Sequence, residues 1–394
     1  MTARFDCIVL GLGGFGSASL YHAAARGLSV LGLEQYSIGH DRGSSHGETR
    51  IIRKAYFEHP DYVPLLLRAY ELWRDLQATE GFSLMHLCGL LLAGPADGET
   101  IAGARLSARL HDLALDDVSP ADRAAKFAGF RFPDNFDVVH EPEAGFLAVE
   151  RCVNAHVDAA IRTGANVATD EAVLDWARVG STFRVRTSRD EYESAALVLT
   201  AGAWTSSLLS NLALPLRVVR KPQFWFPVRS AAYGEDRSTP AFYYEMPYGL
   251  FYGFPSRDGQ TLKAAEHSGG DPVTDPALVD RTVHTGDIDS LARFLRECLP
   301  EVDPEPARSS VCMYTLSPDQ HFIVDRHPEY EHVAFGAGFS GHGFKFTPVI
   351  GEVLVDLAID GHTRHPIDFL SASRDAITRA TGTGATRKAA GNDG

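Results

Sequence analysis

The chain has 394 residues, 44% of them hydrophobic and 22% charged, and its formal net charge at pH 7 is -14. This length exceeds the usual size of one domain, so we expect two closely packed domains. Nucleic acids and anionic membranes require a basic face, and the acidic balance argues against both partners. The five cysteines are scattered without a CxxC pair, which argues against a disulfide framework and against a thiolate metal site.

Targeting signals are absent from the sequence pattern. No basic segment followed by an apolar run opens the chain, and no apolar stretch is long enough to span a bilayer. The pattern therefore predicts a soluble protein of the reducing cytoplasm, with no metal ion.

A β-α-β unit is predicted at the start of the chain. Apolar runs at Phe5 to Leu10 and Ser29 to Leu33 flank a segment, Gly14 to Arg26, in which small and apolar residues recur at helical spacing. Ala196 to Thr200 is another continuous apolar run, and because such strands are buried on both faces we expect it in the same sheet. Helical spacing recurs at Val63 to Leu76 and at Cys152 to Arg162.

The middle of the chain predicts a different sheet. Short aromatic strands separated by Pro and Gly turns indicate mostly antiparallel pairing between about Leu216 and Ser317. These strands are Gln223 to Val228, Ala241 to Glu245, Leu250 to Phe254 and Thr261 to Ala265.

The predicted fold class is α/β (α+β), with a Rossmann-like dinucleotide-binding domain and a discontinuous second domain on a mostly antiparallel sheet. We expect the first domain to comprise residues 1–85, 147–215 and 319–372, and the second, catalytic domain to comprise residues 86–146 and 216–318. Residues 381–394 are rich in Gly, Ala, Thr and Lys, which predicts a disordered tail.

A glycine-rich turn follows the first predicted strand. Gly11, Gly13 and Gly16 have the spacing that lets a backbone turn tightly, approach a pyrophosphate and pack a helix on a sheet. Glu34 ends the second strand 18 residues after Gly16, where a carboxylate accepts from a ribose hydroxyl. This fingerprint predicts dinucleotide binding without separating NAD from FAD.

A polar segment follows that acidic residue. Its hydroxyls and guanidiniums are suited to phosphates, a flavin ring or a carboxylate substrate, although a solvated polar loop is the alternative. The residues are Ser44, Ser45, His46, Thr49, Arg50 and Arg53.

The aromatic strands carry Tyr243, Tyr244, Tyr248 and Tyr252, followed by Lys263 and His267. Aromatic alternation in strands is more often core packing than a substrate cage. Lys263 is the exception, because a desolvated ammonium at the end of such a strand is a strong local charge.

Cys312 and a glycine turn near residue 342 form the last candidate. A lone cysteine is ordinarily a small buried residue. However, Gly341, His342, Gly343 and Lys345 precede Thr347 and Pro348, which predict an N-cap and a first helical residue. Helix N–H groups and an ammonium would then meet at an anion site, suited to the N1–C2=O edge of a reduced flavin and able to ionise a nearby thiol.

These residues resemble the monomeric sarcosine oxidase and N-methyltryptophan oxidase family of flavoenzymes, from Phe5 to about Phe369. The most specific segments are residues 45–53, 251–255, 311–315 and 338–345. The resemblance implies FAD as the dinucleotide, a fold of the D-amino-acid-oxidase type, a monomer, and a thioether between Cys312 and the flavin 8α-methyl group.

The resemblance also implies roles for single residues. Arg53 and Lys345 would bind the substrate carboxylate, Tyr252 and His267 would line the substrate cavity, and Lys263 would activate oxygen. Arg50 and His46 match positions close to the isoalloxazine ring. Further cofactor contacts are expected from Ser44, Ser45, Val173, Met313, Gly341, His342 and Gly343.

Two residues depart from the pattern of the sarcosine enzymes. Ser45 stands where they have a second histidine, and Glu266 stands where they have an aromatic residue. We expect Glu266 to change the charge of the cavity and hence substrate choice.

The predicted function is the oxidation of a secondary amino acid by FAD and oxygen. An N-methyl, sarcosine-like substrate would give the demethylated amino acid, formaldehyde and hydrogen peroxide. The alternatives are a cyclic imino acid (pipecolate-like or proline-like) or glycated amino acid as substrate, a flavin dehydrogenase with an acceptor other than oxygen, a nicotinamide-dependent dehydrogenase, and a non-catalytic FAD-binding protein.

Overall fold

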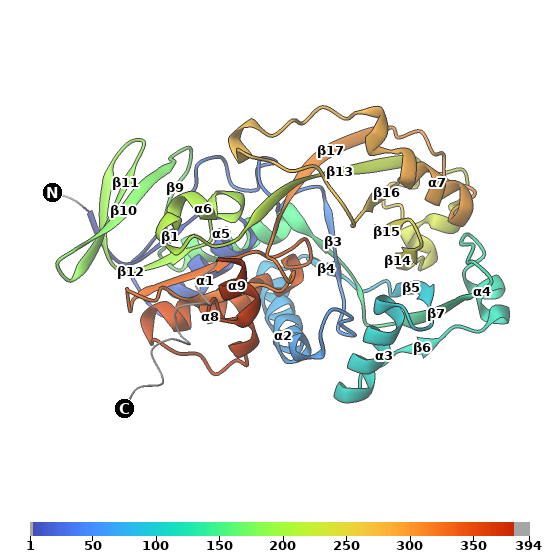
Figure 1. Cartoon of the computed structure of the whole chain (residues 1–394), viewed down its shortest axis with the longest axis horizontal. Coiled ribbons are helices and arrows are strands. Elements are labelled where there is room, and N and C mark those ends of the chain that lie inside the picture. Colours follow the sequence, from blue (N-terminus) through green and yellow to red (C-terminus); the bar gives the residue numbers. More distant parts are fainter. Residues whose placement is uncertain (1–2, 382–394) are drawn as a thin grey trace.

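The computed structural model describes residues 3–381. The molecule is elongated, with one sheet and its helices in each half (Figure 1). Residues 382–394, which hold nearly all of the predicted disordered tail, lie outside the described residues. None of the described helices combines the length and the apolar character needed to cross a membrane.

The sheet of the first half contains the predicted β-α-β unit. β1 (Ala3–Leu10), α1 (Gly14–Ala25) and β2 (Val30–Leu33) form it, and β1 lies parallel between β2 and β12 (Glu191–Leu199). The prediction that the apolar run at Ala196 joins this sheet is confirmed, since Ala196 pairs with Cys7. The remaining strands are β9 (Asn166–Ala168), β10 (Val173–Val179), β11 (Thr182–Thr187), β18 (Ile323–Arg326) and β19 (Val333–Ala337).

Four helices pack in this half. α1 contacts α5 (Val149–Arg162) and α8 (Thr347–Ile359), while α2 (Val63–Glu80) contacts α8. α1 and α8 approach closely because Gly351 has no side chain: a Cβ there would lie 2.6 Å from the Ala18 Cβ. The short helices α6 (Thr205–Leu208) and α9 (Asp375–Ala380) lie in the same half (Figure 1).

The sheet of the second half confirms the predicted antiparallel arrangement. Its order is β17 (Arg308–Leu316), β13 (Arg217–Pro227), β16 (Thr261–Glu266), β15 (Gly249–Gly253), β14 (Ala241–Met246), β5 (Leu90–Pro95), β7 (Phe136–Glu141) and β6 (Asp116–Asp117). Only β14 and β5 pair in parallel. The helices α3 (Glu99–His111), α4 (Pro120–Lys126) and α7 (Asp289–Cys298) belong to this half (Figure 1).

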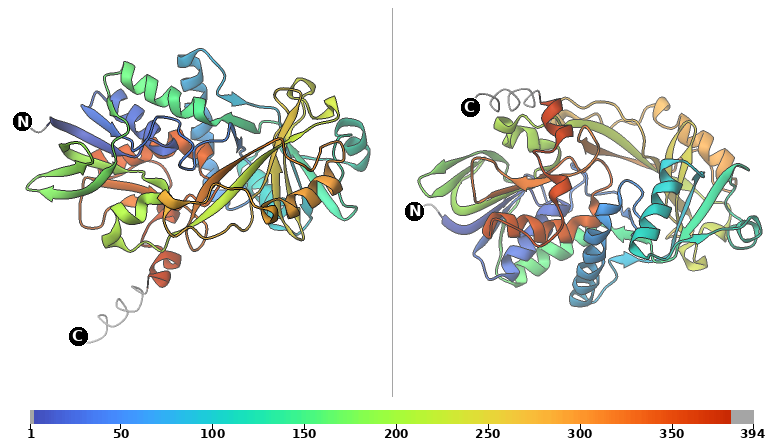
Figure 2. Two further views of the ribbon diagram at one scale, coloured as in Figure 1. Left: turned by 90° about the horizontal axis from the view of Figure 1, so that it is seen from above. Right: turned by 60° about the horizontal axis from the view of Figure 1, so that its bottom comes forward.

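A small sheet and a pair of long strands join the halves. A three-stranded sheet of β3 (Thr49–Ile52), β8 (Gly145–Ala148) and β4 (Met85–His86) lies between them. The long strands β13 and β17 run from one half to the other in all views (Figures 1 and 2). The chain therefore passes repeatedly between the halves, and the exact domain limits stay a prediction.

Candidate active site

The glycine turn between β1 and α1 is sterically closed to larger residues. Gly11 has φ +89°, and a Cβ there would lie 2.9 Å from the Thr200 carbonyl oxygen. A Cβ on Gly16 would lie 1.8 Å from the Gly11 carbonyl oxygen. Gly11 and Gly16 are therefore required by the backbone itself, which brings the N-terminus of α1 against β1 and β12, whereas a Cβ on Gly13 would meet only Ser45 Oγ, at 3.6 Å.

Glu34 lies at the end of β2 and is buried. Its carboxylate accepts hydrogen bonds from the backbone N–H groups of Leu12 (2.8 Å) and Tyr36 (3.1 Å), and His40 Nε2 lies 3.3 Å away. The carboxylate thus fixes the glycine turn and borders the cleft that begins there, where a ribose would lie in a dinucleotide complex.

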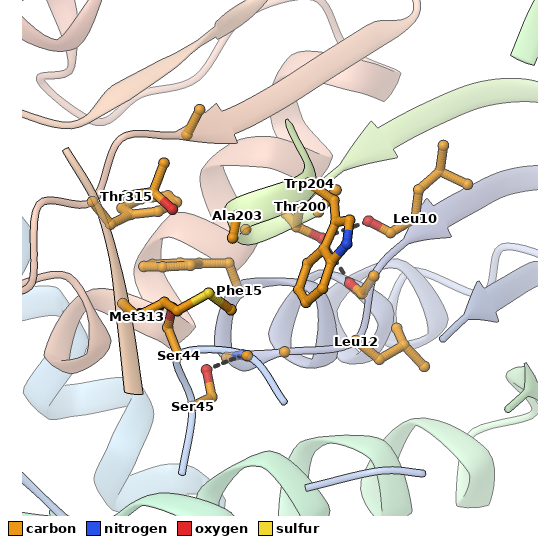
Figure 3. A pocket seen from close by; sticks show the side chains of 18 of the residues that line it. Leu10, Leu12, Phe15, Ser44, Ser45, Thr200, Ala203, Trp204, Met313 and Thr315 are labelled. Carbon is orange, nitrogen blue, oxygen red and sulfur yellow. Dashed lines mark hydrogen bonds between the residues drawn. The ribbon is translucent and has the colours of Figure 1, made fainter. Parts of the chain in front are cut away.

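A long cleft starts at this turn and continues toward β17. Figure 3 shows Phe15, Ser44, Ser45, Trp204 and Met313 around it. Of the predicted cofactor contacts, the cleft is lined by Gly11, Gly13, Glu34, Ser44, Ser45, Arg50, Val173, Met313, Gly341 and Gly343.

The other four predicted contacts, Gly16, Cys312, His342 and Lys345, are not among the described residues that line this cleft. Gly16 packs α1 on the sheet instead.

Two serines attach the polar loop to both sides of the cleft. Ser45 Oγ accepts from the Gly14 N–H at 3.0 Å, and Ser44 Oγ donates to the Met313 carbonyl at 2.7 Å. The loop therefore joins the start of α1 to β17, which is some 270 residues later in the chain. The positions of Ser44 and Met313 were predicted separately, and the structure brings them together.

Cys312 is a buried thiol in a cationic environment. Its Sγ lies 3.4 Å from Arg50 Nη2. Burial opposes ionisation, but His46, Arg50 and Lys263 stabilise the thiolate and lower the pKa of Cys312 from 9.0 to about 6. This shift favours the thiolate form at neutral pH, unlike at Cys7, whose pKa burial raises to about 12.

Lys263 is buried at 3% exposure without a carboxylate partner within the described part of the chain. Its Nζ donates to the carbonyls of Gly47 and Thr49, and lies 5.4 Å from the centre of the Trp225 ring. Burial, with Arg50 nearby, lowers the pKa of Lys263 well below its usual value.

Several buried polar atoms near Cys312 have no hydrogen-bond partner among the described residues. They include His46 Nε2, Gln223 Nε2 and Thr315 Oγ1. Gln223 Oε1 lies 3.4 Å from Arg50 Nη1, and Thr315 lines the cleft. Buried polar groups are nearly always paired, so the Thr315 hydroxyl in the cleft fits a ligand with polar ring atoms, as a flavin has, whereas His46 and Gln223 are not among its described lining residues.

Arg53 and Lys345, called the cationic pair below, both lie against the ring of one aromatic residue, Tyr56. The Arg53 guanidinium carbon is 4.2 Å and Lys345 Nζ is 5.1 Å from the centre of the Tyr56 ring. Both side chains are buried, at 4% and 5% exposure. Lys345 Nζ donates to the His342 carbonyl at 2.6 Å.

The cationic pair has one internal carboxylate. Arg53 Nη2 donates to Glu58 Oε2 at 2.5 Å. Burial raises the pKa of Glu58, but Arg53, His342 and Lys345 lower it to about 2, so Glu58 is ionised at neutral pH. Burial and the charge of Arg53 lower the pKa of Lys345 from 10.5 to about 7, although Glu58 opposes this shift.

The predicted N-cap before α8 is wrong. Thr347 is the first residue of α8, no side chain caps the helix, and Thr347 Oγ1 is buried without a partner among the described residues. Lys345 instead lies in a short 3-10 turn, Phe344–Phe346. Phe346 occupies the capping position, and because its side chain has no hydrogen-bond acceptor it cannot cap the helix.

Tyr252, His267 and Tyr314 form an aromatic wall. The ring centres of Tyr252 and Tyr314 lie 6.4 and 5.5 Å from that of His267, and His267 Nδ1 is 3.4 Å from the Tyr314 hydroxyl. Burial, with Lys221 and His342 nearby, lowers the pKa of His267 to about 3, so its imidazole is neutral.

Glu266 faces away from this wall. Ala265, its neighbour, pairs with Tyr252, so strand alternation directs Glu266 to the opposite face of the sheet. There its carboxylate accepts from the hydroxyls of Ser268 and Ser290, the latter on α7. This geometry does not support the expectation that Glu266 changes the charge of the cavity. Ser45, the other departure, has a structural contact with α1.

The sequence reasoning did not include three residues of the site. They are Glu58, Glu141 and Lys221. The buried carboxylate of Glu141 accepts hydrogen bonds from the N–H groups of Lys54 (2.5 Å) and Ala55 (3.2 Å). Lys221 Nζ donates to the carbonyls of His267 (3.1 Å), Ser268 (2.7 Å) and Gly269 (3.4 Å). Only Glu58 had a local signal, as an acid five residues after Arg53.

A family model described as FAD dependent oxidoreductase matches residues 6–357 of the chain. The chain belongs to this family. FAD is therefore the dinucleotide, and the alternative of a nicotinamide-dependent dehydrogenase is not favoured.

Curated relatives cover nearly the whole chain. A monomeric sarcosine oxidase from Streptomyces avermitilis is 39% identical over 96% of this chain and 100% of its own length. An N-methyl-L-tryptophan oxidase from Yersinia pestis is 36% identical over 94% of this chain and 98% of its own length. These similarities confirm the predicted resemblance.

Solved structures confirm the fold. NikD, an unusual amino acid oxidase essential for nikkomycin biosynthesis, has a TM-score of 0.83 and 27% identity over 94% of this chain and 98% of that chain. L-proline dehydrogenase from P. horikoshii has a TM-score of 0.82 at 18% identity, covering 97% of this chain and 99% of that chain. The second similarity concerns the fold alone.

Proposed function

We propose that this FAD-dependent enzyme oxidises an N-methyl amino acid of the sarcosine type, with oxygen as acceptor. The products would be the demethylated amino acid, formaldehyde and hydrogen peroxide. The observation that carries the proposal is the buried cationic pair beside Tyr56, near an aromatic wall that bears a neutral histidine. The names of the curated relatives support the same substrate class.

Charge balance favours one carboxylate at the cationic pair. Arg53 and Lys345 carry two positive charges when protonated, and Glu58 is the one carboxylate among the described residues that forms an ion pair with either of them, while Glu141 acts on both at longer range. A substrate carboxylate would neutralise the remaining charge in a site with little water, where a charge-assisted hydrogen bond is strong. The substrate would thus be held by its carboxylate, with its amine beyond the cations.

The aromatic wall would orient the amine. Tyr252 stays protonated because burial raises its pKa, and His267 stays neutral, so neither brings a charge that would oppose a neutral amine. FAD, when bound, would accept two electrons from the substrate carbon and deliver them to oxygen. Lys263, when protonated, would place a positive charge where oxygen becomes reduced.

We further propose that Cys312 attaches the FAD through a thioether to the 8α-methyl group. The lowered pKa of this thiol and its 3.4 Å separation from Arg50 Nη2 support the proposal. After acid precipitation, flavin colour should stay with the protein and the Cys312 peptide should carry the mass of the flavin. Cys312→Ser should release any bound flavin to the supernatant, whereas Cys88→Ser should not. Full release from the unaltered protein would contradict the attachment.

A cytoplasmic monomer remains part of the proposal. Size-exclusion chromatography with light scattering would test the monomer, and fractionation of the producing cells would test the location.

The main experiment is a substrate panel with peroxide and formaldehyde measured in parallel. Sarcosine and larger N-methyl amino acids should give both products in equal amounts. Peroxide from a cyclic imino acid or a glycated amino acid, with no formaldehyde from any N-methyl compound, would overturn the proposed substrate.

The role of oxygen has its own test. Lys263→Met should slow reoxidation of the reduced flavin by oxygen while leaving anaerobic reduction by substrate less affected. If reoxidation is unchanged, Lys263 does not activate oxygen. If the unaltered protein reduces a quinone but not oxygen, the enzyme is a dehydrogenase.

A further inference from the structure

Tyr243 on β14 has a buried hydroxyl with no hydrogen-bond partner among the described residues. The side chain is only 6% exposed. The next residue, Tyr244, is also buried, but its hydroxyl donates to the Arg131 carbonyl at 3.2 Å. A buried hydroxyl without a partner is unfavourable, so the lone hydroxyl of Tyr243 requires an explanation.

The strand register places Tyr243 beside the aromatic wall. Tyr243 pairs with Tyr252 on β15, and directly opposite residues share one face of a sheet. Its ring centre lies 6.0 Å from that of His267 and 5.1 Å from that of Phe57. Phe57 in turn lies under the Arg53 guanidinium, at 3.8 Å. Tyr243 therefore lies between the wall and the cationic pair.

Three carboxylates act electrostatically on this hydroxyl. Burial raises the pKa of Tyr243 well above its usual value, and the charges of Glu58, Glu99 and Glu245 act in the same direction, whereas Arg53 opposes them. The phenol is therefore protonated, and its oxygen can still accept a hydrogen bond.

Two of these carboxylates lie where α3 begins. Glu245 Oε2 accepts from the Thr100 N–H at 2.8 Å, which fixes the first turn of α3 against β14. Glu99 in that turn is exposed. Within residues 3–381, neither Glu99 nor Glu245 takes part in an ion pair. We call Glu99 and Glu245 the acidic rim.

The acidic rim gives this side of the site the opposite charge to the cationic pair. A substrate carboxylate held by Arg53 and Lys345 would leave the rest of the molecule free to extend along the wall toward Tyr243. A cationic group reaching this region would donate to the Tyr243 oxygen and be attracted by the two carboxylates of the acidic rim.

We propose that Tyr243 and the acidic rim form a subsite for the substrate side chain, and that this side chain carries an amine or another cationic hydrogen-bond donor. The inference rests on the proposed oxidation of N-methyl amino acids, and it narrows that class to basic members. Tyr243 discriminates between substrate side chains, whereas the cationic pair and the flavin act on the parts that all substrates of the enzyme have in common.

A matched pair of substrates tests the proposal. Nα-methyl-L-lysine and Nα-methyl-L-norleucine have similar length and differ mainly in the terminal ammonium. The unaltered enzyme should show a kcat/KM at least about tenfold higher for the lysine compound, as expected for a hydrogen bond to a charged group. Tyr243→Phe should remove most of that preference, because kcat/KM should fall much more for the lysine compound than for the norleucine compound.

Tyr244→Phe is the control, because it removes a tyrosine hydroxyl from the same strand on the opposite face. It should keep the preference of the unaltered enzyme. Glu99→Gln, at an exposed position that does not disturb the core, should lower the preference by about twofold to threefold, as expected for a partly screened charge. Thermal unfolding and flavin content would verify that each variant is folded.

Several outcomes would overturn the subsite. Equal kcat/KM for the two compounds in the unaltered enzyme would overturn it. An equal loss of kcat/KM for both compounds in Tyr243→Phe would also overturn it, because the hydroxyl would then contact the carboxylate or amine that both compounds share. An unchanged preference in Glu99→Gln would remove Glu99 from the subsite. Oxidation of sarcosine alone overturns only this inference, whereas no peroxide from any N-methyl compound overturns the proposed function as well.

Discussion

The two ends of the candidate site are built in different ways. At the glycine turn, backbone groups of one continuous segment form the site, and Glu34 holds them in place. At the cationic pair, the groups that would bind substrate are the buried side chains of Arg53 and Lys345 around Tyr56, with the partly exposed Glu58 paired to Arg53. The shape of the glycine turn depends on the absence of side chains, whereas binding at the cationic pair depends on the balance of a few charges.

The largest effect is expected at the glycine turn. Gly16→Ala would place a Cβ 1.8 Å from the Gly11 carbonyl oxygen, so backbone must shift. Overpacking of this kind costs about 1–3 kcal/mol, and we expect loss of most bound flavin. The flavin absorbance per protein and the thermal midpoint measure the two effects. Gly286→Ala, where no atom lies within 4 Å of the added Cβ, should change neither. Normal flavin content in Gly16→Ala would refute the steric argument.

Lys345→Met comes next and acts on the other end. It removes one cation of the pair and leaves Arg53 in its ion pair with Glu58, so a substrate carboxylate loses one of its two cationic partners. We expect a KM about 10²-fold higher for N-methyl amino acids, as for truncating one member of a buried charge pair. Steady-state kinetics would measure the rise in KM. Lys126→Met is the control, because Lys126 lies at the surface and pairs with Asp122. A KM within twofold of the unaltered value would contradict the assignment.

The pH dependence of carboxylate binding sharpens the same comparison. The pKa of Lys345 is lowered to about 7, so its ammonium is present below that pH and is lost above it. Binding of acetate, a carboxylate without an amine, should therefore weaken as pH rises through about 7. The inhibition constant measured from pH 5 to 9 gives the profile. Lys345→Met should bind acetate weakly at every pH, and an identical profile in both proteins would exclude Lys345 as the titrating group.

A smaller effect is expected for Lys221→Met. The change leaves three carbonyls, of His267, Ser268 and Gly269, without their donor. Lost buried hydrogen bonds cost about 1–3 kcal/mol, and a less ordered His267 should raise KM more than it lowers kcat. Chemical unfolding and steady-state kinetics test both parts.

Arg229→Gln is the control for Lys221→Met. Its side chain is 60% exposed and pairs with Asp303 just after β13, so the change should alter stability by less than about 0.5 kcal/mol. A fall in kcat with no rise in KM in Lys221→Met would argue against a positioning role.

The same difference explains what the sequence could predict. The β-α-β unit and Glu34 follow from spacing within 34 residues, because local sterics determine them. The antiparallel sheet followed from alternation and turn residues. The contacts of Lys221 and Glu141 could not be predicted, since they depend on which backbone groups meet after the halves pack. Thr347 was misassigned because a suitable capping residue does not show that the helix begins after it.

The pairing of β13 with β17 limits how the two halves of the molecule can move. They pair continuously from Arg217 with Leu316 to Trp225 with Arg308, and this ladder includes Cys312 opposite Lys221. The proposed point of flavin attachment and the lysine that holds the His267 turn are thus cross-strand neighbours in one stiff ribbon. Hinge bending between the halves would have to shear this ribbon, so substrate entry is expected to rely on movements of loops, while the distance between flavin and aromatic wall stays constant.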